Sequence, residues 1–186
     1  MRQLFWMALL VGAWGCNQAT DPAADKKARQ KSPYFDMVGF MSQLERNSKG
    51  MALRKRALMG DKYEEKTLKN PELRRELGIF FAADLRKPAW QGVYHTERHG
   101  ANTTYTARND KPELRLLVVG ADSAGRVARL DLHMLQDNYL YSSDASGSLY
   151  VRYDGGKPKL DSVALSGTQR IVFGSPFIYT LQGKFL

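Results

Sequence analysis

The sequence predicts an α+β domain in which two N-terminal amphipathic helices pack on a strongly twisted antiparallel sheet. Apolar residues recur at helical spacing in two segments of the first half of the chain. After Gln91, short alternating apolar and polar segments are separated by turn residues, a pattern typical of strands. Strands joined by short turns pair antiparallel, and so many of them curl into a half-barrel or incomplete barrel rather than staying flat.

Two start signals predict where the helices begin. Ser32 is suited to cap a helix whose first residue is Pro33, where a missing N–H costs nothing, so we expect a helix over 33–46. Asn70 and the proline after it form a second signal of this kind, which predicts a helix over 71–87. Both segments carry one apolar face, so both helices are expected to cover the sheet.

The remaining segments are predicted as strands. Residues 52–68 form an exposed hairpin around Gly60 and Asp61, with a helix as the alternative. Alternation is strictest around His133, where every second residue from Ala128 to Met134 is apolar and those between are polar, so that strand has one buried face. The further strands are expected at 93–99, 102–108, 113–119, 126–135, 139–143, 148–153, 162–173 and 177–185.

Residues 1–15 have the layout of a secretory signal peptide. Arg2 supplies the positive charge, an uncharged apolar run follows, and small residues precede Cys16. The run is shorter than the about 20 apolar residues that span a bilayer. Cys16 is the single cysteine of the chain and has no partner for an internal disulfide. The segment resembles a bacterial lipoprotein signal, which implies acylation of Cys16 and cleavage before it; an ordinary signal peptide is the alternative.

Composition divides the rest of the chain into a tether and one domain. Residues 16–32 lack apolar periodicity and are predicted as a flexible tether, while 33–186 is long enough for a single domain with its own core. The net charge of +9 suggests attraction to anionic lipid headgroups or glycans, although a generally basic, solvated surface is the alternative. Because the cationic residues form no single stripe and the chain carries an export signal, we expect no nucleic-acid partner.

His95, Glu97 and His99 are the candidate metal ligands. In a strand, residues two apart lie on one face, so the two imidazoles and the carboxylate are expected to lie together. Such a group suits zinc or another transition metal, and it would make the protein a metal-dependent hydrolase of the cell envelope. The alternative is a solvated strand face without metal. The chain has no Walker or dinucleotide-binding fingerprint, and we predict no cofactor.

Two weaker patterns complete the search for a site. Asp131 and His133 share a strand face, and Ser142 or Ser143 is a conceivable nucleophile, but no Gly-x-Ser-x-Gly motif frames either serine, so we predict no catalytic residues. Aromatic residues are frequent in the strands. Half-buried tyrosines are able to line a groove for a sugar or an acyl chain, although strand propensity explains the same composition.

Several segments resemble an uncharacterised family of bacterial envelope lipoproteins. These are Cys16 and the stretches SPYFDMVGFMSQL, RKPAWQG, NYLYSS and GTQRIVFGSPFIYTLQGKF. The resemblance implies an outer-membrane lipoprotein, facing the periplasm or the cell surface, and Asn17 in place of an aspartate agrees with that location. It implies no known activity. Because the sequence lacks a catalytic signature, we expect a non-catalytic binding or scaffolding role for an apolar ligand, an envelope glycan or an envelope protein. The predicted architecture is similar to the incomplete barrels that carry lipids or lipoproteins between membranes.

Overall fold

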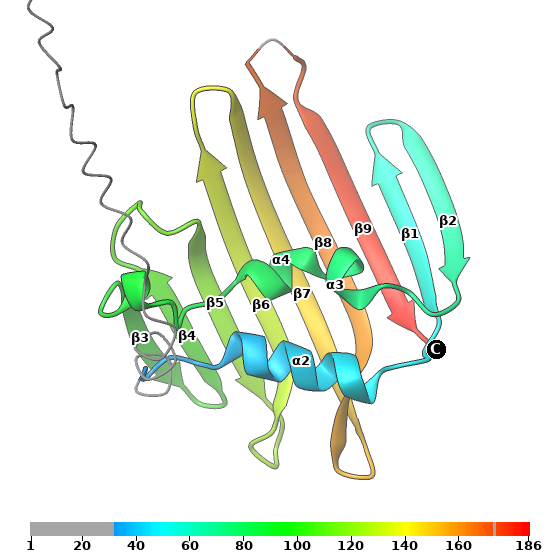
Figure 1. Cartoon of the computed structure of the whole chain (residues 1–186), viewed down its shortest axis with the longest axis vertical. Coiled ribbons are helices and arrows are strands. Elements are labelled where there is room, and N and C mark those ends of the chain that lie inside the picture. The colour runs from blue at the N-terminus through cyan, green and yellow to red at the C-terminus, as the bar shows by residue number, and fades with distance from the viewer. Residues whose placement is uncertain (1–31, 173) are drawn as a thin grey trace, which may run out of the picture.

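The computed structural model describes residues 32–172 and 174–186, so Cys16, the predicted signal and most of the predicted tether lie outside the described residues. Within them, nine strands form one antiparallel sheet in the order β2-β1-β9-β8-β7-β6-β5-β4-β3. The sheet is open, because β2 and β3 lie at its two ends (Figure 1). The strands are β1 (Leu53–Met59), β2 (Lys62–Leu68), β3 (Tyr94–His99), β4 (Asn102–Ala107), β5 (Leu114–Ala121), β6 (Val127–Asp137), β7 (Tyr141–Asp154), β8 (Lys157–Ile171) and β9 (Phe177–Phe185).

The strand with the strictest alternation has one buried face, as predicted. Leu130 and Leu132 of β6 are 0% and 3% exposed. Arg129 and Asp131, between them, point to the opposite, hydrated face and form an ion pair of 2.6 Å. The predicted hairpin at 52–68 is also confirmed, because β1 and β2 pair in register across the turn at Gly60.

The prediction of two separate strands at 139–143 and 148–153 is wrong, because residues 141–154 form one continuous strand, β7. The expected break at 144–147 stays extended and pairs on both sides. Asp144 faces Leu135 of β6 and Thr168 of β8 in register. Asp, Ser and Gly favour turns in isolation, but hydrogen bonding to two neighbouring strands overrides that preference here.

The first helix, α2 (Met37–Asn47), begins later than predicted. Its cap is Asp36 and not Ser32. The Asp36 Oδ1 accepts a hydrogen bond from the backbone N–H of Gly39 at 3.0 Å. A carboxylate at this position satisfies a free N–H of the first turn and interacts well with the helix dipole, which explains why the helix starts there. The apolar face predicted for it is buried at Met37, Met41 and Leu44.

The prediction of a second long helix over 71–87 is wrong. The segment forms two short helices, α3 (Leu73–Glu76) and α4 (Gly78–Ala82), followed by a 3₁₀ turn, η1 (Pro88–Trp90). Neither α3 nor α4 has a side-chain cap, and Asn70 has a φ of 54° and lies outside the helix. Gly78 disfavours a continuous helix by about 1 kcal/mol relative to alanine. The apolar residues are nevertheless buried.

A hydrogen-bonded clamp joins the end of α2 to β8. The Ser48 hydroxyl accepts from the backbone N–H of Leu160 at 2.8 Å, and the Asn47 side-chain amide donates to the carbonyl of Pro158 at 2.9 Å. The register between β7 and β8 shifts at Tyr150, next to this contact. The clamp fixes α2 against the sheet.

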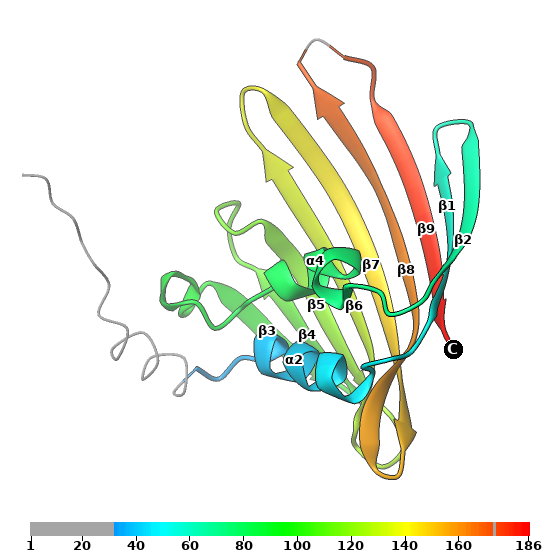
Figure 2. The same ribbon diagram turned by 45° about the vertical axis from the view of Figure 1, so that its right-hand side comes forward.

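The core lies between the helices and the concave face of the curved sheet (Figure 2). Its fully buried large side chains are Phe80, Phe185, Met37, Met41, Leu44, Leu53, Leu77, Leu85, Leu117, Leu130, Leu149 and Leu160. The helices cross one part of that face and leave the end with the β1–β2, β6–β7 and β8–β9 turns uncovered (Figures 1 and 2). Among the described residues, no helix has both the length and the apolar character needed to cross a membrane.

Candidate functional site

A cavity of about 410 Å³ lies on the uncovered part of the concave face, between α3 and strands β1, β2 and β9. Alternate residues of the three strands point into it, as strand geometry requires. Ala57 is the small residue at its floor, flanked in register by Glu64 and Leu181. The apolar lining residues are Ala57, Met59, Leu68, Phe177, Tyr179 and Leu181, and the polar ones are Lys55, Glu64, Lys66, Arg75, Glu76 and Thr180.

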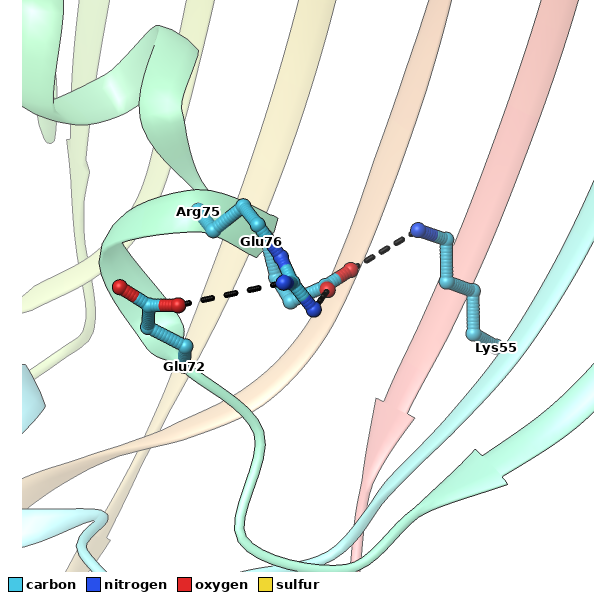
Figure 3. A network of polar contacts seen from close by, with 4 residues as sticks. All are labelled: Lys55, Glu72, Arg75 and Glu76. Atoms are coloured by element: carbon cyan, nitrogen blue, oxygen red, sulfur yellow. Dashed lines mark hydrogen bonds and ion pairs between the residues drawn. The ribbon is translucent and has the colours of Figure 1, made fainter.

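An ion-pair network fixes the wall that α3 contributes (Figure 3). Glu76, whose side chain is 7% exposed, accepts from Lys55 Nζ at 2.8 Å and lies 3.5 Å from Arg75 Nη2. Arg75 also lies 4.0 Å from Glu72, and its side chain reaches into solvent. A carboxylate this buried needs a cationic partner, because an unpaired charge inside a protein is strongly destabilising. The Lys55–Glu76 pair therefore holds α3 above β1.

The opposite wall is aromatic. The rings of Phe177 and Tyr179 stack with their centroids 6.3 Å apart. Burial raises the pKa of the Tyr179 hydroxyl above its ordinary value, and Tyr141 raises it further, so Tyr179 stays neutral at physiological pH. Phe177 and Met59 are 43% and 39% exposed at the mouth of the cavity.

The cavity has the size of a small-molecule pocket and a mixed lining. The volume falls in the range of about 300–1,000 Å³ typical of small-molecule pockets, and half of the lining residues are apolar and half polar. Its charged residues come from α3, β1 and β2, whereas the aromatic wall belongs to β9. Such a cavity suits a molecule with an apolar body and a polar end.

The candidate metal ligands lie together, as predicted, on the exposed face of edge strand β3. His95 Nε2 is 3.2 Å from one Glu97 carboxylate oxygen, and His99 Nε2 is 3.7 Å from the other. All three side chains are more than half exposed. Within residues 32–172 and 174–186, no group of three His, Cys, Asp or Glu side chains has an arrangement able to hold a metal ion. Metal binding stays a prediction.

The structure separates the residues of the conceivable triad. His133 Nε2 contacts Asp144 Oδ1 at 2.9 Å, and Asp131 accepts from the Ser148 hydroxyl at 2.6 Å. Ser142 instead faces Asp137 in register. Asp131 and His133 border a shallow hollow on the convex face, on the opposite side of the sheet from the cavity. They belong to a network of surface polar contacts.

The sequence does not reveal the cavity, because the lining residues come from strands far apart in the chain. β1 pairs with β9, so Leu53 faces Phe185. Alternate residues of β9 share a face, and Phe177, Tyr179 and Leu181 all line the cavity. The alternation within β9 does not indicate which strand pairs with it.

Comparison with protein-family models, with curated proteins and with solved structures found no match for this chain.

Proposed function

We propose that this protein is a lipid-anchored protein of the bacterial cell envelope that binds an apolar ligand without catalysis. The observation that carries the proposal is the cavity of about 410 Å³ on the uncovered part of the concave face. The finer architecture that we propose with it is a half-barrel, in which the curved sheet encloses the ligand from one side and the helices bound it from the other.

The lining favours an acyl chain with an anionic end over a glycan. Ala57 and Leu181 offer an apolar floor, and the neutral Tyr179 adds aromatic surface. Lys66 and Arg75 border the cavity with exposed cationic side chains, suited to a carboxylate or phosphate. A glycan would instead require many hydrogen-bonding groups across the floor.

A lipid anchor would place the cavity close to a membrane, where acyl chains are available as ligands. Acylation of Cys16 would hold the protein at a membrane, and more than one acyl chain makes that attachment stable. We propose the outer membrane as its location. Palmitate labelling of cells tests the anchor: we expect label in the wild-type protein and none in Cys16→Ala. Equal labelling of both proteins would refute acylation at Cys16.

Binding is tested with a fluorescent long-chain fatty acid added to the full-length protein. Ala57→Trp fills the floor of the cavity and is expected to abolish binding. Ala164→Trp is the matched control, because Ala164 is a partly exposed alanine that lines the hollow on the opposite face of the same sheet. We expect the control to bind as the wild type does. Absence of binding by the wild type, or equal binding by both variants, contradicts the proposal.

A further inference from the structure

Exposed apolar side chains gather at three turns of the sheet. Tyr139 and Leu140, in the β6–β7 turn, are 98% and 68% exposed. Across the described residues, every exposed large apolar side chain except Tyr150 and Leu186 lies in or beside the β1–β2, β6–β7 and β8–β9 turns. They are Leu58, Met59, Tyr63, Tyr139, Leu140, Ile171, Val172, Phe177 and Ile178.

These three turns lie at one end of the molecule (Figures 1 and 2). The β5–β6 and β7–β8 turns, at the opposite end, carry no large apolar side chain: the first contains Asp122 and Ser123, and the second contains Gly155 and Gly156. Exposed apolar surface costs about 25 cal/mol for each Å² kept in water, so its confinement to one end needs an explanation.

We propose that this end of the sheet docks on a lipid bilayer, with the three turns inserting their apolar side chains among the headgroups. The apolar residues project from separate turns rather than forming one flat patch, which suits a deformable lipid surface better than a rigid protein. Tyrosine is favoured at the membrane interface, because its ring is apolar and its hydroxyl stays hydrated.

Cationic side chains next to the turns are balanced by acidic ones, so attraction to an anionic lipid surface comes from the net charge of the whole chain. Lys62 follows the β1–β2 turn and Arg170 precedes the exposed apolar residues of the β8–β9 turn, and both side chains are exposed. Asp61 and Asp137 lie nearby with the opposite sign, while the whole chain carries a net charge of +9. Attraction of cationic residues to anionic headgroups contributes about 1 kcal/mol for each Lys or Arg near the surface.

Docking in this orientation also connects the membrane to the cavity. Met59 and Phe177 line the cavity and belong to the exposed apolar residues at the turns. A ligand would then pass between bilayer and cavity without crossing water. This consequence rests on the proposed function, whereas the docking surface itself does not.

The test places one fluorescent probe at a time on the full chain carrying Cys16→Ser. An environment-sensitive label is attached at Leu140→Cys or at Ile178→Cys, and Ser123→Cys, an exposed residue of a turn at the opposite end, is the matched control. Vesicles of phosphatidylethanolamine and phosphatidylglycerol carry brominated acyl chains as quenchers. We expect a blue shift and quenching at both apolar turns and neither at position 123. An equal response at all positions, or none at any, overturns the proposal.

A second substitution separates lipid contact from self-association. Adding Ile178→Glu to the labelled Leu140→Cys chain is expected to lower the quenching several-fold, whereas Leu186→Glu, an equally drastic change at an exposed residue away from the turns, leaves it unchanged. Sedimentation without vesicles measures self-association. If Ile178→Glu abolishes a dimer but does not change the quenching, the surface binds a second copy of the chain and the proposal is wrong. Adding Ala57→Trp should not change the quenching, so failure of ligand binding remains distinguishable from failure of docking.

Discussion

Tyr179 of β9 lies across Gly167, its register partner on β8. A methyl group at Gly167 would come within 2.7 Å of the Tyr179 hydroxyl oxygen and 2.7 Å of the backbone carbonyl oxygen of Asp144. The Tyr179 side chain is able to rotate away, whereas the Asp144 carbonyl is part of the hydrogen-bonded backbone of β7 and stays in place. The aromatic wall of the cavity therefore depends on a glycine in the neighbouring strand.

Gly167→Ala is expected to destabilise the fold by about 1–3 kcal/mol, the usual result of adding a methyl group to a packed region. The substitution forces a shift of β7 or displaces Tyr179, so we also expect weaker binding of the fluorescent fatty acid. Urea unfolding measures the first effect and a binding titration the second.

Gly78→Ala is the matched control for that change. Gly78 begins α4, its φ is not positive, and a Cβ there meets no atom within 4 Å. Alanine in a helix is favoured over glycine, so the control should be neutral or stabilised by up to about 1 kcal/mol. If both variants unfold at the same urea concentration, the close approach at Gly167 has no energetic effect.

Ser48→Ala is expected to cost about 1–3 kcal/mol, because it leaves the buried N–H of Leu160 without its acceptor. Ser48 is 2% exposed, so water does not readily replace the hydroxyl. Ser123→Ala, in the exposed β5–β6 turn, should change stability by less than about 0.5 kcal/mol. Thermal unfolding of the two variants gives the comparison, and a Ser48→Ala protein as stable as the wild type would show that the clamp between α2 and β8 is dispensable.

Stability is expected to fall in acid partly through Asp161. Burial raises the pKa of this carboxyl, but hydrogen bonds from Lys184 Nζ at 2.7 Å and Ser162 Oγ at 3.1 Å outweigh burial, so its pKa is lowered overall. A carboxyl whose folded pKa lies below its unfolded value stabilises the fold at higher pH. That contribution is present above about pH 3.9, the unfolded value, and is lost as pH falls through the folded pKa.

Asp161→Asn removes the titrating group. The gap in unfolding free energy between wild type and Asp161→Asn should be constant near neutral pH and shrink as pH falls below about 3.9. Repeating the comparison in a Lys184→Met background should reduce the pH dependence, because Lys184 is one cause of the lowered pKa. A gap of the same size at every pH would mean that Asp161 titrates alike in both states.

The parts of the fold that follow from local pattern were predictable. The bounds 177–185 expected for the last strand are those of β9, in which Phe177, Tyr179 and Leu181 alternate with residues of the other face. The continuation of β7 through Asp144 was not predictable locally, since its turn-forming residues are held extended by two neighbouring strands. The broken second helix has a similar cause: burial of Leu77 and Phe80 does not require a continuous helix.

The candidate sites divide in the same way. Residues two apart on one strand were correctly expected to lie together, and Glu97 does contact both His95 and His99. The cavity needs the pairing of β1 with β9, which joins residues at opposite ends of the described chain. Neither strand's sequence encodes that partner, so Ala57 could not be recognised as the floor of a site.

Zinc binding at His95, Glu97 and His99 is the remaining prediction from the sequence. If these residues form a site, the full-length protein titrated with zinc alone should bind one equivalent, and His99→Ala should abolish binding, because two ligands on an exposed strand hold the ion poorly. His133→Ala is the matched control, since His133 contacts Asp144 and lies on a different strand. Elemental analysis after desalting measures the stoichiometry. Binding well below one equivalent, or loss of zinc in His133→Ala as large as in His99→Ala, would refute the metal site and with it the proposed hydrolase. The proposal for the cavity on the other face of the sheet does not depend on this result.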